Sequence, residues 1–140
     1  MLEPLMLKTN VERKGQFTPI PRFIRKQVTR SHCQLQNCGL AYGKIFKDVH
    51  GKLRNPKQCL HHLISRRFLA EHGIYEHHPT NLLSICSSPC HGKLLKIEDR
   101  LFQGDVIGFL SGMKQCGVPI EKVVHFALSV GLKEFGGLTI

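Results

Sequence analysis

The sequence contains no long apolar run, no export signal and no internal repeat. No stretch approaches the ~20 consecutive apolar residues that a transmembrane helix needs, so no membrane span is expected. The first residues, MLEPLM, place a carboxylate before any basic group and lack the apolar core of a signal peptide, which predicts a cytoplasmic protein. The fractions of hydrophobic (41%) and charged (21%) residues are those of a globular protein.

Acidic residues are scarce relative to basic ones. The 140 residues include 20 Lys and Arg but only 10 Asp and Glu, which gives a formal net charge of +10. A positive field of this kind attracts polyanions, of which nucleic acid is the first expectation and anionic membranes or acidic proteins come after it. A basic protein without a polyanionic partner is the simpler alternative, because net charge alone does not identify a ligand.

Six cysteines occur in a chain without an export signal, which favours metal ligands or buried thiols over disulfides. Four of them form two close pairs, Cys33 with Cys38 and Cys86 with Cys90. Zinc binds four soft ligands in a tetrahedron, usually as two pairs from distant parts of a sequence. We therefore predict a structural zinc ion held by these four residues. The alternative is that some of them are buried free thiols.

The pattern of apolar and turn-forming residues predicts an α+β fold. Apolar residues at helical spacing predict a short basic helix within residues 19–30. Residues 41–48 and 58–64 are expected to form two strands, paired as a hairpin across the turn-rich segment 50–56. The helices expected further along the chain span residues 90–102, 105–116 and 119–132.

Histidines and one asparagine between the cysteines form a second group of potential ligands. His61 and His62 are adjacent on an expected strand, so their side chains point to opposite faces and cannot readily chelate one ion together. They can divide the work, one holding a metal while the other acts on a substrate. His91 directly follows Cys90 at a helix start, where a zinc site would direct it towards the hairpin. Asn81 can either hold the loop by side-chain hydrogen bonds or touch the metal.

The order of these motifs resembles that of one nuclease family. The matching elements are His61-His62, then Asn81-Leu82, then Cys86-x3-Cys90-His91, with Cys33-x4-Cys38 upstream. Over residues 19–100 the chain resembles the zinc-supported HNH endonucleases, the ββα-metal (His-Me finger) nucleases. The cysteine spacings of x4 and x3 are wider than the x2 that is commoner in that family. The resemblance implies a ββα-metal core, preceded here by the basic helix.

The resemblance also implies a role for each matching residue. His61 and His91 match the ligands of a catalytic divalent ion, Mg²⁺ or another metal such as Mn²⁺ or Ni²⁺. His62 matches the general base that activates water, and a neutral imidazole with a pKa near ~6.5 can do this at physiological pH. Asn81 matches the central asparagine, which orients the loop and in some members binds the metal. The implied activity is hydrolysis of phosphodiester bonds, with double-stranded DNA as the expected partner.

Basic residues flank the candidate site and could clamp phosphates without reading sequence: Arg66, Arg67, Lys93 and Lys96. For each of them an ordinary solvated charge is an equal alternative. His72, His77 and His78 are expected on the surface, and the His77-His78 pair lies only three residues before Asn81, too close for the motif.

We divide the chain into a flexible basic arm (1–18), an HNH nuclease domain with structural zinc (19–103) and a C-terminal helical appendage (104–140). The main alternative function is a zinc-stabilised, non-catalytic nucleic-acid-binding module, and a further alternative is a zinc-containing protein-interaction domain. The intact set of His61, His62, Asn81 and His91 favours the nuclease, because a scaffold needs only the cysteines. No sequence feature supports a homodimer or a larger phage or mobile-element assembly.

Overall fold

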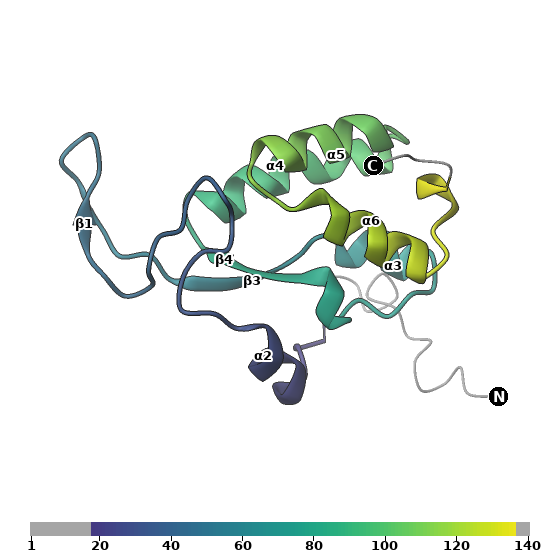
Figure 1. Cartoon of the computed structure of the whole chain (residues 1–140), viewed down its shortest axis with the longest axis horizontal. Helices are drawn as coiled ribbons and strands as arrows, with labels where there is room; N and C mark the ends of the chain where they lie inside the picture. The colour runs from purple at the N-terminus through teal and green to yellow at the C-terminus, as the bar shows by residue number, and fades with distance from the viewer. Residues whose placement is uncertain (1–17, 137–140) are drawn as a thin grey trace.

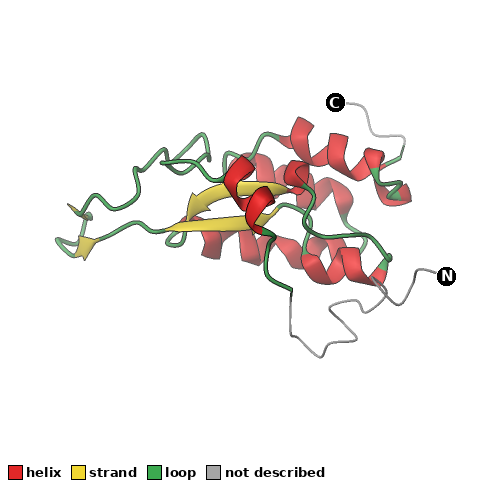
Figure 2. Cartoon of the chain, turned by 90° about the horizontal axis from the view of Figure 1, so that it is seen from below, coloured by secondary structure: helices red, strands yellow, loops and turns green. Residues whose placement is uncertain are grey.

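Two strands far apart in the sequence form the central sheet. β3 (Gln58–His62) pairs antiparallel with β4 (Leu82–Cys86), in a register that runs from Gln58 opposite Cys86 to His62 opposite Leu82. The computed structural model describes residues 18–136, so the basic arm predicted at 1–18 lies outside the described residues except for Thr18. With helices around this sheet (Figures 1 and 2), the protein has the α+β fold that was predicted.

The hairpin predicted between residues 41–48 and 58–64 was wrong. β1 (Phe46–Lys47) pairs instead with β2 (Leu53–Arg54), in a small separate ribbon that projects from the body in both views (Figures 1 and 2). Both residues of β2 are exposed, whereas all five residues of β4 are buried. β3 therefore pairs with β4 because that pairing removes far more apolar surface from water.

The expected helices are present, and a short helix lies in the segment between β3 and β4. Asp105 caps one of them, since its carboxylate accepts a hydrogen bond of 2.9 Å from the backbone N–H of Gly108. Ser65 caps another, through a bond of 3.1 Å from the N–H of Phe68. The helices are α2 (Arg22–Val28), α3 (Arg66–Glu71), α4 (Cys90–Phe102), α5 (Val106–Gln115) and α6 (Ile120–Ser129), with 3₁₀ turns η1 (Pro79–Asn81) and η2 (Lys133–Phe135). Within the described part of the chain, no helix is long and apolar enough to cross a membrane.

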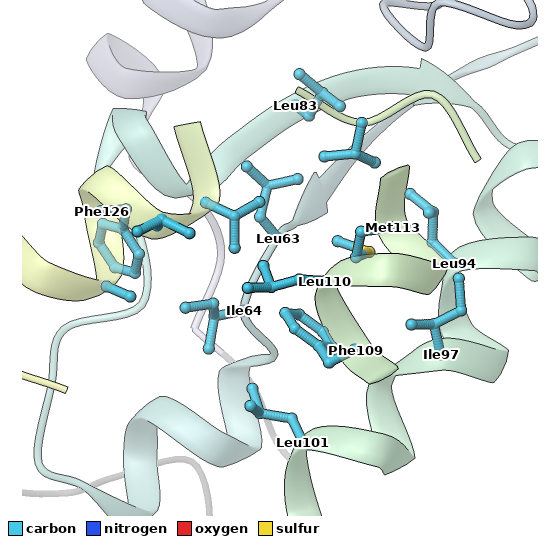
Figure 3. Close-up of a cluster of buried hydrophobic side chains, with 14 of the residues drawn as sticks. Leu63, Ile64, Leu83, Leu94, Ile97, Leu101, Phe109, Leu110, Met113 and Phe126 are labelled. Carbon is cyan, nitrogen blue, oxygen red and sulfur yellow. The ribbon is translucent and has the colours of Figure 1, made fainter. Parts of the chain in front are cut away.

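One hydrophobic core joins the sheet to the C-terminal helices. Figure 3 shows Met113 of α5 near Leu94 of α4, while Phe109 of α5 points towards Ile64, in the segment that follows β3. Phe126 of α6 is also fully buried in this cluster. The helices predicted as an appendage at 104–140 thus share the core of the preceding residues. The division into domains stays a prediction.

The turn between α5 and α6 contacts the loop that carries the first cysteine pair. The backbone N–H of Gln36 donates to the carbonyl of Gly117 at 3.1 Å, and the Asn37 side-chain amide donates to the carbonyl of Gln115 at 2.8 Å. Gly117 has φ +91°, and a Cβ there would lie only 2.8 Å from the Gln36 nitrogen. Only glycine fits this position without displacing the cysteine loop.

Candidate metal centre and active site

The four paired cysteines converge at one end of the sheet. Their sulfur atoms all lie within 4.8 Å of one another. Across the two pairs, Cys33 Sγ is 3.7 Å from Cys90 Sγ, and Cys38 Sγ is 3.9 Å from Cys86 Sγ. The predicted convergence is confirmed, and four soft donors in this arrangement could hold a metal ion such as zinc.

Local structure brings each pair to this position. Cys86 is the last residue of β4 and Cys90 the first of α4, so the turn between strand and helix sets their separation. The other pair lies in a loop closed by backbone hydrogen bonds, from Cys33 N–H to the carbonyl of Leu40 (2.8 Å) and from Cys38 N–H to the carbonyl of Leu35 (3.0 Å). His91, as the second residue of α4, is positioned directly by this cluster.

The alternation of side chains along β3 gives the two adjacent histidines different neighbours. The ring of His61 meets that of His91 on α4 edge to face, with 5.4 Å between ring centroids. The ring of His62 meets His77 instead, from the loop after α3. All of these except His77 line one cleft of about 470 Å³, together with Arg66 and Glu98. The two histidines have different ring contacts, as the alternation along a strand predicts, but both line the same cleft.

His61 presents an unpaired nitrogen beside a carboxylate. Its side chain is 2% exposed, and Nε2 has no hydrogen-bond partner among the described residues. Glu98 Oε1 lies 3.9 Å from this nitrogen. Burial lowers the pKa of His61 to about 3, with a smaller effect from His91, and raises the pKa of Glu98 to about 7. Burial thus keeps the His61 imidazole neutral and leaves the Glu98 carboxyl partly protonated near neutral pH, and a bound cation would satisfy the imidazole lone pair and the carboxylate together.

Glu98 was missed in the sequence, although a signal for it existed. His91 and Glu98 are seven residues apart on α4, which is two turns, so they lie on the same face of the helix. Among the described residues, only the four cysteines bring three or more donor atoms within 4.8 Å of one another. The potential ligand atoms of His61, His91 and Glu98 are spaced more widely around the cleft than the four sulfur atoms are.

His62 is buried and held at both ring nitrogens. Its Nε2 lies 3.0 Å from His77 Nδ1, and its Nδ1 accepts a hydrogen bond of 3.3 Å from Arg66 Nε. Burial lowers the pKa of His62 to about 2, and repulsion from Arg66, His77 and His61 adds to the effect. The imidazole is therefore neutral at physiological pH, the state that a general base requires.

The expectation that His77 lies on the surface was wrong. Its side chain is 1% exposed, because its loop folds back against β3 and against Thr18, whose backbone carbonyl lies 3.1 Å from His77 Nε2. His72 does lie on the surface, where its Nε2 is 2.8 Å from Glu134 Oε2. His78 is half-buried, with its ring 5.6 Å from that of Phe126.

Asn81 holds the loop between the strands. Its side chain is fully buried, and its Oδ1 accepts a hydrogen bond of 2.8 Å from the N–H of Ile64. Its Nδ2 donates to the carbonyls of Ile64 (3.1 Å) and Glu76 (3.3 Å). Of the two roles considered for Asn81, its contacts here are those of loop support, because they hold the backbone at Ile64 and at Glu76.

The four predicted phosphate-binding residues separate into two groups. Arg66 and Arg67 line the histidine cleft, with the Arg67 guanidinium 5.2 Å from the centre of the Phe102 ring. Lys93 lines a different cavity of about 330 Å³, beside Cys38 and Cys90. Lys96 is exposed on α4. The two arginines are thus better placed than the two lysines to meet a ligand in the histidine cleft.

Comparisons with known proteins add no family to this description. The chain matches no protein-family model, no curated protein and no solved structure. The chemistry of the site is therefore argued from the contacts, burial and charges described above.

The lowered pKa of His62 predicts a specific dependence of stability on pH. An unfolded histidine has a pKa near ~6.5, so below that pH the unfolded chain takes up a proton that buried His62 refuses. The contribution is fully present above the unfolded pKa and is lost as the pH falls towards the folded one. Between about pH 7 and about pH 5.5, wild type should lose roughly 1 kcal/mol more free energy of unfolding than His62→Gln. Urea denaturation of both proteins checks this, and parallel pH curves would contradict it.

Proposed function

We propose that this chain is a metal-dependent HNH endonuclease that hydrolyses phosphodiester bonds in DNA. The observation that supports it most is the division of labour along β3. His61 faces His91 and Glu98, while the adjacent His62 is held as a neutral base, and both line one cleft. A purely structural protein has no need of this arrangement, since a buried nitrogen without a partner costs stability.

The arrangement of the sheet and α4 supports the same proposal. β3, β4 and α4 form two antiparallel strands followed by a helix that starts at the cysteine cluster. In the ββα-metal fold that we propose for them, the strands are joined by the long segment 63–81 rather than by a tight turn. Asn81 and α3 lie in that segment, so it supplies both loop support and the arginines of the cleft.

We further propose that the four cysteines hold a structural zinc ion. Three of them are buried, and their donor set is the thiolate set that zinc prefers. A bound zinc ion would fix the start of α4 and would thereby fix the position of His91. The zinc and the catalytic ion would then have separate tasks, one in the fold and one in the chemistry.

In the proposed mechanism, His61, His91 and Glu98 would hold a divalent ion such as Mg²⁺, Mn²⁺ or Ni²⁺. Such an ion supplies charge stabilisation at the scissile phosphate and at the leaving 3′ oxygen. His62 takes the proton of the attacking water at Nδ1. Arg66 donates to that nitrogen in the structure, but an anionic phosphate is a stronger acceptor for a guanidinium than a neutral imidazole is. The negative charge of the phosphate also raises the pKa of His62 and strengthens it as a base.

Incubation of supercoiled plasmid with the purified protein tests this function. We expect conversion to nicked or linear DNA with Mg²⁺, Mn²⁺ or Ni²⁺, and none with excess chelator. His125, an exposed histidine on α6, provides a matched control as His125→Ala, which should cleave like wild type. Salt-sensitive DNA binding without cleavage under any of the metals would contradict the nuclease and indicate the non-catalytic binding module instead.

A further inference from the structure

A chain of hydrogen bonds, buried at its centre and part-buried at its two ends, runs from the cleft through two histidines. It starts at Arg66 Nε, passes through both ring nitrogens of His62 and then through both ring nitrogens of His77. It ends at Thr18, whose carbonyl and hydroxyl oxygens each lie 3.1 Å from His77 Nε2. The proposed mechanism uses His62 but leaves His77 without a role.

The donors at the cleft end fix where the protons are. A guanidinium donates and cannot accept, so His62 Nδ1 must carry a lone pair. The proton of neutral His62 is therefore on Nε2, from where it is donated to His77 Nδ1 at 3.0 Å. His77 in turn must carry its proton on Nε2, where Thr18 accepts it. The Glu76 carboxylate, 4.0 Å from that nitrogen, favours the same assignment.

A role in binding a metal does not fit His77. Both of its ring nitrogens are engaged, one with His62 and the other with Thr18. Its ring also packs edge-on against Tyr75, with 5.4 Å between ring centroids, and it does not line the cleft. These contacts are those of a residue that orients its neighbours, and they leave no ring nitrogen of His77 for contact with a substrate.

We propose that His77 is a positioning residue that holds the His62 imidazole in the tautomer whose Nδ1 lone pair faces the cleft. This inference rests on the proposed nuclease function. When Nδ1 takes the proton of water, His62 becomes an imidazolium with an N–H at each nitrogen. His77 Nδ1 still accepts the Nε2–H bond, which becomes charge-assisted and therefore stronger. No proton leaves the His62–His77 pair in this step.

The first test compares two substitutions of His77. His77→Leu removes the acceptor and should lower the single-turnover rate of plasmid nicking by about 10–100-fold, the usual effect of losing a group that orients a catalytic residue. His77→Asn keeps an acceptor near the Nδ1 position and should stay within a few-fold of wild type. DNA affinity and zinc content should be those of wild type in both.

Combination with His62→Ala separates positioning from a merely structural role. If His77 acts through His62, His77→Leu should cause no further loss of rate in the His62→Ala background. A structural role would lower the rate in both backgrounds, and asparagine would not rescue it. An undiminished rate for His77→Leu, in a wild type that does cleave, would overturn the inference and leave the nuclease function standing. Absence of cleavage by the wild-type protein would instead contradict the proposed nuclease function.

Nuclear magnetic resonance of the wild-type protein tests the geometry without a variant. In protein with ¹⁵N-labelled histidine, long-range ¹H–¹⁵N correlations distinguish the two neutral tautomers. We expect the Nε2–H form for both His62 and His77. The Nδ1–H form at His62 would overturn the inference even if His77→Leu failed to fold.

Discussion

His62→Ala should lower the single-turnover rate of plasmid nicking by about 10²–10⁴-fold, the range typical of a general base. The imidazole is neutral, buried and directed with Nδ1 towards the cleft, so its loss removes the group that takes the proton of water. The substitution leaves the cysteines and the ligands of the proposed catalytic ion in place. DNA affinity, measured by fluorescence anisotropy, and zinc content should therefore be unchanged.

Two further variants make the His62 result specific. His125→Ala replaces an exposed histidine far along the chain on α6 and should cleave at the wild-type rate. His61→Ala removes a proposed ligand of the catalytic ion, so its defect should lessen as the Mn²⁺ concentration rises, whereas that of His62→Ala should not. Nicking by His62→Ala at the wild-type rate would show that His62 is not the base.

Loss of the metal from the four cysteines should unfold the protein. Structural zinc contributes on the order of 10–16 kcal/mol of apparent folding free energy, which matches or exceeds the ~5–15 kcal/mol stability of a typical domain. Cys33, Cys86 and Cys90 belong to the main hydrophobic core, so the metal would be bonded directly into it. We expect Cys86→Ala to lose both bound zinc, measured by elemental analysis against one ion per chain in wild type, and its cooperative urea transition.

Cys116→Ala is the matched control for this result. Cys116 is half-buried and lies outside the four-cysteine cluster, so its replacement should keep the zinc and cost little stability. If Cys86→Ala kept one zinc ion and unfolded at the wild-type urea concentration, the cluster could not be the structural site. Free buried thiols would then be the better description of the four cysteines.

The sequence was a good guide to helices and a poor one to strand pairing. α4, α5 and α6 each repeat apolar residues over ten or more positions, a local pattern that sequence alone reveals. β3 and β4 have five residues each and meet across a long excursion of the chain. Which strand pairs with which depends on what each can bury, and this is decided by distant residues rather than by the strand itself.

The candidate site residues show the same contrast: those in a sequence motif could be predicted, and those placed by tertiary packing could not. His61, His62, Asn81 and His91 were found because their order in the sequence is itself a pattern. Glu98 belongs to no motif; its spacing of seven residues from His91 indicates only a shared helix face, and its position beside His61 depends on the packing of α4 on β4. His77 lies beside another histidine in a polar loop, and it is buried because that loop folds back against His62 and Thr18.

The contact at Gly117 links the unfolding of the C-terminal helices to that of the cysteine cluster. The α5–α6 turn is bonded through its backbone to the loop between Cys33 and Cys38, and its helices fill the core beneath the sheet. A chain cut near residue 104 would lose the support of one side of the cysteine cluster and expose Phe109 and Phe126 to water. Metal release, exposure of the core and opening of the cleft should therefore occur as one cooperative transition, with no stable fragment that retains only residues 19–103.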